Sequence, residues 1–238
     1  MPKGKETDPG EGRRASDRGR YGRLTRERVL ATALEVVDRD GLSGLSMRKL
    51  GGELGVEAMA LYRYAAGKGA LLDGLVEAFY QELEEDLTAK RQEERHPQGD
   101  DWRQELKRIA LATHGVALRH PNMVPLLATR LLSTPLARRP AAVLRSDERV
   151  LALLQGAGLG DRRTVEVHRA FTAWLLGYLL VELRAMDDEP GEPDPAFRLG
   201  LHRMPAQEFP RLRATAIALD GQGGQEQLAA GLDALLGS

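Results

Sequence analysis

The 238-residue chain lacks cysteine, long apolar runs and an apolar leader. Without cysteine it can form no disulfide, no thiolate metal site and no cysteine nucleophile. No segment approaches the roughly 18 apolar residues that a membrane span requires, and the N-terminus has no signal-peptide core. These absences predict a cytoplasmic protein with no membrane partner.

Recognisable catalytic motifs are absent as well. The chain contains no G-x-S-x-G elbow, no H-E-x-x-H pair, no P-loop and no dinucleotide-binding glycine pattern. Its histidines are scattered, and none stands four residues from another, the spacing that places two side chains on one helical face. We therefore expect no enzyme, no metal site and no cofactor. The histidines are His96, His114, His120, His168 and His202.

The formal net charge is only −1, but the charges are unevenly distributed. Residues 1–68 carry a net positive charge, and the remainder carries a net negative charge. A basic head on an acidic body is typical of a protein whose one end faces nucleic acid. Ordinary solvated surface charge is the alternative explanation.

Helical periodicity is the main positive signal. Thr25 and Ser46 are predicted N-caps, each followed by apolar residues at helical spacing. Gly41 and Gly55 are predicted to end the first two helices, because glycine tolerates the left-handed conformation that follows a helix. A third helix is expected over residues 56–64, with Val56, Leu61 and Tyr64 facing inward.

The rest of the chain also reads as helical, with no strand-rich segment. The predicted fold is all-α: an N-terminal three-helix helix-turn-helix DNA-binding domain plus a C-terminal helical ligand-binding and dimerisation domain. We expect a disordered basic arm over 1–23, the DNA-binding domain over 24–68 and the effector-binding and dimerisation domain over 69–238. The arm is either an inert tail or a segment that lies along DNA. Body helices are expected over 70–91, 102–119, 123–132, 141–157, 161–186, 211–219 and 225–236, with an irregular proline-rich segment over 187–210.

Two short helices around a tight turn are typical of a helix-turn-helix that enters the DNA major groove. A plain helical hairpin is the alternative. Exposed basic and aromatic side chains beside small residues suit phosphate contact and close approach to base edges. The predicted DNA-binding residues are Ser46, Met47, Arg48, Ala58, Met59, Ala60, Tyr62, Arg63, Tyr64 and Lys68.

The residues around this motif resemble the DNA-binding head of the TetR family of bacterial repressors. The resemblance rests on Gly41 and Leu45, the segment MRKLGGELGV, the LYRY of residues 61–64 and the K-x-x-L-L that begins at Lys68. A weaker resemblance to the Tet repressor subgroup covers the body, through Trp102, Thr129-Arg130 and GYLLVEL.

This resemblance implies a ligand-responsive repressor that binds a palindromic operator in double-stranded DNA. It implies a homodimer that pairs through residues 161–186 and 211–236, and a small-molecule effector bound in the body. Where the Tet repressor presents Gln-Pro-Thr to its operator, this chain has Ala58, Met59 and Ala60, so base reading there must rely on apolar contact, for instance with thymine methyl groups. The rival classes are a helical small-molecule-binding protein and a protein-interaction module, both without a DNA role.

Polar and aromatic side chains within apolar body segments are candidates for an effector pocket, because helical bundles bind ligands between their helices. For any single one of them a core residue with a satisfied hydrogen bond is the favoured interpretation, and as a set some of them are expected to line a pocket. Positions that hold tetracycline and magnesium in the Tet repressor correspond to Glu84, Ile109 and Leu126, so we expect a different, largely apolar effector. The candidates are Thr113, His114, Asn122, Thr129, His168, Thr172, Trp174 and Tyr178.

Overall fold

The computed structural model describes residues 24–93, 101–187, 203–219 and 223–237, and all regular elements in these ranges are helical. The predicted basic arm and most of the proline-rich segment over 187–210 lie outside the described residues. The chain divides into two compact units at Ala78 and Phe79, within the helix α4 (Lys68–Glu93). None of the described helices combines the length and the apolarity needed to cross a bilayer.

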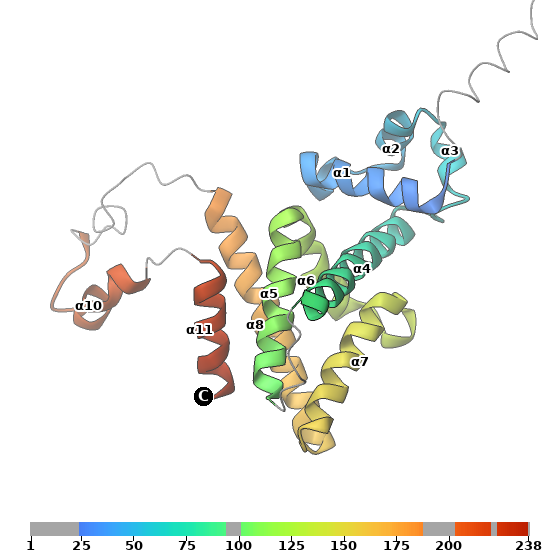
Figure 1. The fold of residues 1–238 in the computed structure, drawn as a ribbon. Helices are drawn as coiled ribbons and strands as arrows, with labels where there is room; N and C mark the ends of the chain where they lie inside the picture. The colour runs from blue at the N-terminus through green and yellow to red at the C-terminus, as the bar shows by residue number, and fades with distance from the viewer. Residues whose placement is uncertain (1–23, 94–100, 188–202, 220–222, 238) are drawn as a thin grey trace, which may run out of the picture. The chain divides into compact units, whose positions relative to one another are not determined.

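The first unit contains α1 (Arg26–Gly44), α2 (Met47–Leu54), α3 (Ala58–Leu61) and the start of α4 (Figure 1). Both predicted N-caps are confirmed. The hydroxyl oxygens of Thr25 and Ser46 accept hydrogen bonds from the backbone N–H groups of Arg28 and Lys49, each at 3.2 Å. Gly41 interrupts α1 with a φ of 71° and a non-helical ψ, which confirms the predicted break.

The third helix is shorter than the predicted 56–64. Only α3 is helical, and residues 62–64 form a turn. Backbone bonds from Ala60 N to Glu57 O and from Tyr64 N to Leu61 O close three-residue turns at both ends of α3. The apolar spacing indicated which residues face inward, but it could not distinguish a continuous helix from one helical turn followed by a tighter one.

Packing in the first unit brings α2 and α3 into backbone contact at Gly51. A Cβ atom at Gly51 would lie 2.8 Å from Val56 O and 3.2 Å from Ala58 N. Gly55 makes the intervening turn with a left-handed φ of 66°. The buried apolar residues of the first unit include Val29, Ala33, Val36, Val37, Leu45, Leu50, Leu54, Leu61, Leu71 and Leu75.

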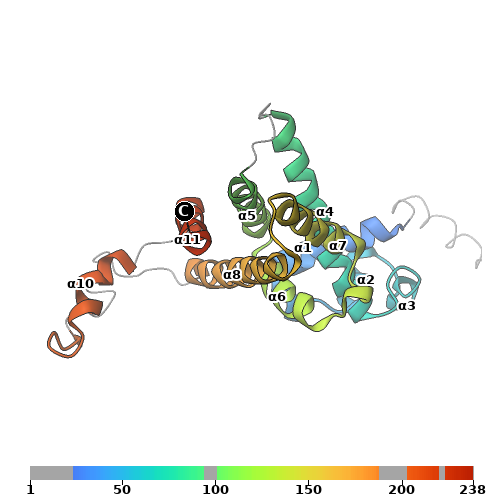
Figure 2. The same cartoon turned by 90° about the horizontal axis from the view of Figure 1, so that it is seen from below.

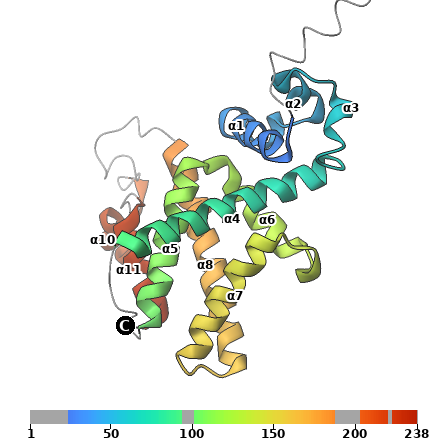
Figure 3. The same cartoon turned by 45° about the vertical axis from the view of Figure 1, so that its right-hand side comes forward.

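The second unit is a bundle of helices arranged around α8 (Asp161–Asp187), which packs against the helices α5, α6 and α7 (Figures 2 and 3). The terminal helix α11 lies along α5. Prolines stand at helix starts, where a missing N–H costs no hydrogen bond. The remaining elements are α5 (Trp102–Arg119), η1 (Pro121–Met123), α6 (Val124–Ser133), η2 (Leu136–Arg138), α7 (Ala141–Gly156), α10 (Pro210–Leu219) and α11 (Gln225–Leu236).

The close contact at Gly51 yields a matched pair of substitutions in one short helix. We expect Gly51→Ala to lower the free energy of unfolding by about 2 kcal/mol, because the added methyl meets backbone atoms that cannot rotate away. Gly52→Ala meets no atom within 4 Å and should raise it by roughly 0.5–1 kcal/mol through helix propensity. Urea unfolding of the full chain measures both, and equal effects of the two changes would contradict this account of the α2–α3 contact.

Candidate functional site

The predicted DNA-binding residues, with one exception, lie on the solvent-accessible side of α2, α3 and the start of α4. Met59 is 74% exposed and Tyr62 is 47% exposed. Arg48, Arg63 and Lys68 are also exposed, and Lys68 is the first residue of α4. Ser46 is exposed too, while Met47, Ala58 and Ala60 are partly covered. All nine of these side chains are therefore at least partly accessible to solvent, and we call this set of residues the α3 face.

Tyr64 is the exception. Its side chain is half-buried, and its hydroxyl donates a hydrogen bond to the backbone carbonyl of Leu24 at 2.9 Å. This bond ties the turn after α3 to the residue before the cap of α1. The structure therefore gives Tyr64 an internal role, in keeping with the inward position that its spacing predicted.

Cations in the first unit fall into two groups. Lys49 and Arg39 form ion pairs with Asp40 at 2.8 and 2.9 Å, and Arg39 also pairs with Glu53. Lys49 and, after it, Arg39 hold the pKa of the Asp40 carboxyl below its usual value. By contrast, Arg48, Arg63 and Lys68 form no ion pair with any residue in the described ranges. The charges left available in this unit thus include three on the α3 face.

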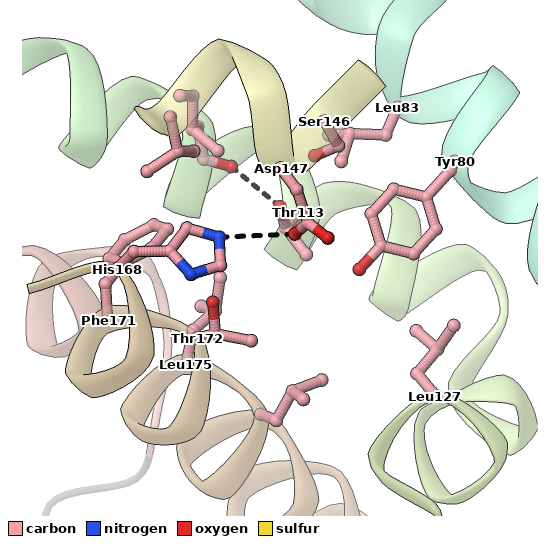
Figure 4. Close-up of a pocket in the computed structure, with 13 residues that line it drawn as sticks. Tyr80, Leu83, Thr113, Leu127, Ser146, Asp147, His168, Phe171, Thr172 and Leu175 are labelled. Carbon is pink, nitrogen blue, oxygen red and sulfur yellow. Dashed lines mark hydrogen bonds and ion pairs between the residues drawn. The ribbon is translucent and has the colours of Figure 1, made fainter. Parts of the chain in front are cut away.

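The second unit contains a small, partly open cavity of about 40 Å³ between helices α4 to α8 (Figure 4). Most of its wall is apolar, and one side carries polar groups. A space of this size accommodates water but not an organic molecule of effector size. The lining residues are Tyr80, Leu83, Ile109, Thr113, Leu127, Ser146, Asp147, Val150, His168, Phe171, Thr172, Leu175 and Leu176.

The charged groups of the cavity wall are linked to one another. His168 Nε2 lies 3.2 Å from Asp147 Oδ1, and the guanidinium of Arg139 lies 3.2 Å from Asp147 Oδ2. Burial and, after it, the charge of Asp147 raise the pKa of the Tyr80 hydroxyl above its usual value. Tyr80 therefore remains a neutral hydrogen-bond donor at physiological pH.

The predicted effector residues separate into two sets. His168, Thr172 and Thr113 line the cavity, whereas Asn122 on η1 and Thr129 on α6 do not. The Thr129 hydroxyl donates to the backbone carbonyl of Pro125 at 2.9 Å. Three lining residues that matter for its chemistry, Tyr80, Ser146 and Asp147, were missed by sequence reasoning. Residue spacing along single helices carried no signal for them.

His114, Trp174 and Tyr178 lie outside the cavity lining, in a cluster between α5, α8 and α11. His114 Nε2 lies 3.0 Å from a carboxylate oxygen of Glu182, and both side chains are buried. The Tyr178 hydroxyl donates to the backbone carbonyl of Gly224 at 3.0 Å, at the start of α11. Trp174 stacks near Tyr178 and covers Gly231, where a Cβ atom would approach the indole ring to 2.9 Å. These contacts dock α11 onto the bundle.

Charged contacts also hold the second half of α4. Arg119 on α5 pairs with Glu82 and Asp86, and His120 lies 2.9 Å from Glu82. Arg149 on α7 pairs with Glu84. Glu84, which corresponds to a tetracycline-binding position in the Tet repressor, is therefore engaged by a neighbouring helix. We call these ion pairs the α4 clamp.

A helix-turn-helix head and a helical body with an internal cavity define the architecture of a one-component regulator. Two family models match the chain: "Bacterial regulatory proteins, tetR family" over residues 29–75, and "Tetracyclin repressor-like, C-terminal domain" over residues 96–237. The chain therefore belongs to the TetR family. Membership confirms the predicted family, the all-α fold and the expectation of a regulator instead of an enzyme.

Individual relatives agree with this assignment. The chain is 33% identical over 179 residues to the HTH-type transcriptional repressor DrrR1 of Streptomyces coeruleorubidus. The aligned region covers 75% of this chain and 60% of DrrR1. It is 28% identical to the class D tetracycline repressor protein of Escherichia coli, over 90% of this chain and 88% of the relative. A crystal structure of a possible TetR family regulator from Streptomyces coelicolor A3(2) is 26% identical, with a TM-score of 0.67, and covers 89% of this chain and all of that one. The chain thus spans less than two thirds of the length of DrrR1.

The buried His114–Glu182 pair allows a stability test. Removing His114 leaves the Glu182 carboxylate buried without its partner, so we expect His114→Ala to lower the free energy of unfolding by about 3 kcal/mol. Arg163→Ala removes an exposed partner of Glu166 and should change it by less than about 1 kcal/mol. Urea denaturation of both variants measures the difference, and a His114→Ala variant as stable as the parent would show that the pair does not anchor this cluster.

Proposed function

We propose that the protein is a ligand-responsive transcriptional repressor that acts in the bacterial cytoplasm as a homodimer on a palindromic operator. The observation that carries the DNA-binding role is the set of three exposed cations on the α3 face that have no ion-pair partner among the described residues. A phosphate backbone provides the negative charge that such cations lack. The relative DrrR1, named as a transcriptional repressor, supports repression as the outcome.

The α3 face suggests distinct roles for its residues. Lys68 stands at the N-terminus of α4, where the helix dipole adds to its charge, so it is assigned to a phosphate. Arg48 and the Tyr62 hydroxyl also reach outward for phosphate oxygens. Arg63 follows Tyr62 in the turn after α3 and is placed to contact a phosphate or a base. Met59 and its small neighbours would approach the base edges.

Dimerisation is supported by the surface of α8. Val181 is 73% exposed, and Ala173 and Gly177, about two turns and one turn before it, are also accessible. Ala173, Gly177 and Val181 recur at intervals of four residues, so they form one apolar stripe along the C-terminal half of a helix whose opposite side is buried in the bundle. A second copy of α8 would cover the stripe, and a two-fold dimer would place two heads on successive major grooves, about 34–36 Å apart.

The cavity is the proposed effector site, and α4 is the proposed route of the signal. Tyr80 lines the cavity from the same helix that begins with Lys68. An effector that enlarges the cavity would alter how the α4 clamp holds this helix. Effector binding relieves repression only if it favours the conformation that cannot bind DNA. The apolar residues Ile109 and Leu126, together with the engaged Glu84, argue against magnesium–tetracycline as the effector.

DNA binding is tested by fluorescence anisotropy with an operator that the full-length protein selects from random DNA. We expect the affinity to fall steeply as the salt concentration rises. Arg63→Ala and Lys68→Ala should each weaken binding. Where a phosphate contact is lost, the slope of the logarithm of the binding constant against the logarithm of the salt concentration should become shallower by about one unit. Arg145→Ala, which removes an exposed cation from α7, is the matched control and should leave both unchanged. Absent or salt-insensitive DNA binding would overturn the proposed function, and a stable monomer in light scattering would overturn the dimer.

Thymine reading by Met59 is tested without changing any hydrogen-bonding group of the DNA. Replacing single thymines of the operator by deoxyuridine removes only the C5 methyl group. We expect at least one replacement in each half-site to weaken binding about fourfold, since burial of one methyl contributes about 0.8 kcal/mol. The Met59→Ala variant should bind both operators equally. Full affinity of the parent protein for every deoxyuridine operator would contradict apolar base reading.

A further inference from the structure

Three hydroxyl groups that line the cavity have no hydrogen-bond partner among the described residues: those of Tyr80, Ser146 and Thr172. They come from three helices, α4, α7 and α8, and Figure 4 shows Tyr80 extending from α4 toward the side that carries Thr172 and His168. Thr113, on α5, differs because its hydroxyl donates to the carbonyl of Ile109 at 2.8 Å. Polar groups at a cavity wall require a partner, either water or a ligand.

The charges at the same wall need no partner from a ligand. Asp147 is shared by Arg139 and His168, so its negative charge is already compensated. An anionic ligand would lie near this carboxylate and would find no unpaired cation among the lining residues. A cationic ligand would have to displace Arg139 or His168 from Asp147. A charged ligand of either sign would also lose its hydration shell on entering a cavity whose walls are mostly apolar.

The remaining surface of the cavity indicates the skeleton of the ligand. Leucines of α4, α6 and α8 and the ring of Phe171 form apolar walls around the hydroxyl groups. Such walls favour a rigid aromatic or alicyclic skeleton, which loses little conformational entropy on binding. Because the cavity measures only about 40 Å³, a ligand must separate the helices that carry the hydroxyls.

We propose that the effector is an uncharged, mainly aromatic molecule with at least two carbonyl or hydroxyl oxygens, which accept hydrogen bonds from Tyr80 and Thr172. This inference rests on the proposed function, since it names the ligand class of the same cavity. Tyr80 is then both a recognition residue and the point at which the ligand acts on α4. Ser146 offers a third hydroxyl for a further oxygen.

The inference is tested by calorimetric titration of the full-length protein with four probes. Dantron (a dihydroxyanthraquinone), chrysin (a dihydroxyflavone) and dihydroxynaphthalene are neutral, and rhein is dantron with an added carboxylate. We expect at least one neutral probe to bind, and rhein to bind at least about tenfold more weakly than dantron if dantron binds, because the carboxylate meets Asp147. The bound probe should also release the operator in the anisotropy assay.

Matched variants locate the contacts. Tyr80→Phe and Thr172→Val each remove one hydroxyl and should lower the affinity for the probe about fivefold, as expected for the loss of one neutral hydrogen bond. Thr88→Val changes an exposed residue of α4 outside the cavity and should leave the affinity unchanged. Tyr80→Phe should not lower the melting temperature, because its hydroxyl has no partner within the described chain.

The outcomes separate this inference from the proposed function. If none of the neutral probes binds, if rhein binds as well as dantron, or if the hydroxyl deletions leave the affinity unchanged, the inferred ligand class is wrong while DNA binding still supports a repressor. If the neutral probes bind as expected but the protein binds no DNA, the ligand class stands and the repressor proposal fails.

Discussion

The ion pairs of the α4 clamp are the constraint on which the proposed signal route depends. Arg119 and Arg149, from two different helices, pair with acidic residues of α4 within the second unit. The same helix begins with Lys68 in the first unit and contributes Tyr80 to the cavity. In the proposed mechanism, coupling between ligand and DNA changes the way α4 is held. Because the clamp consists of partly exposed ion pairs, it can exchange partners at modest cost, unlike a packed apolar contact.

In the first unit, some basic residues form ion pairs within the fold and others do not. Arg39 and Lys49 stabilise the junction of α1 and α2 through Asp40 and Glu53. Arg48, next to Lys49 in the chain, has no such partner among the described residues. Neighbouring basic residues of one short helix thus divide between folding and binding. Net charge alone, which is close to zero, conceals this division.

Local signals predicted the head well. Caps at Thr25 and Ser46 and the glycines at 41 and 55 are set by interactions within a few residues, so they can be read from the chain. The cavity could not be predicted in this way. Tyr80, Asp147 and His168 meet only because α4, α7 and α8 pack together, and no periodicity within one helix records that packing. For the same reason, the sequence did not show that His114 and Tyr178 lie at the contact with α11, outside the cavity lining.

In the proposed mechanism, the small volume of the cavity links the chemistry of the ligand to the signal. A ligand that fitted a preformed space would bind without moving a helix, and equal affinity for both conformations shifts no equilibrium. Here the space accommodates only water, so part of the ligand's binding free energy must be used to separate α4 from α8. On this proposal, contact with the apolar walls supplies the free energy of binding that separates the helices. The hydroxyl groups of Tyr80 and Thr172 determine which molecules can bind. On this proposal, charged ligands are disfavoured because Asp147 is already compensated and the desolvation of an ion would consume the free energy needed for the movement.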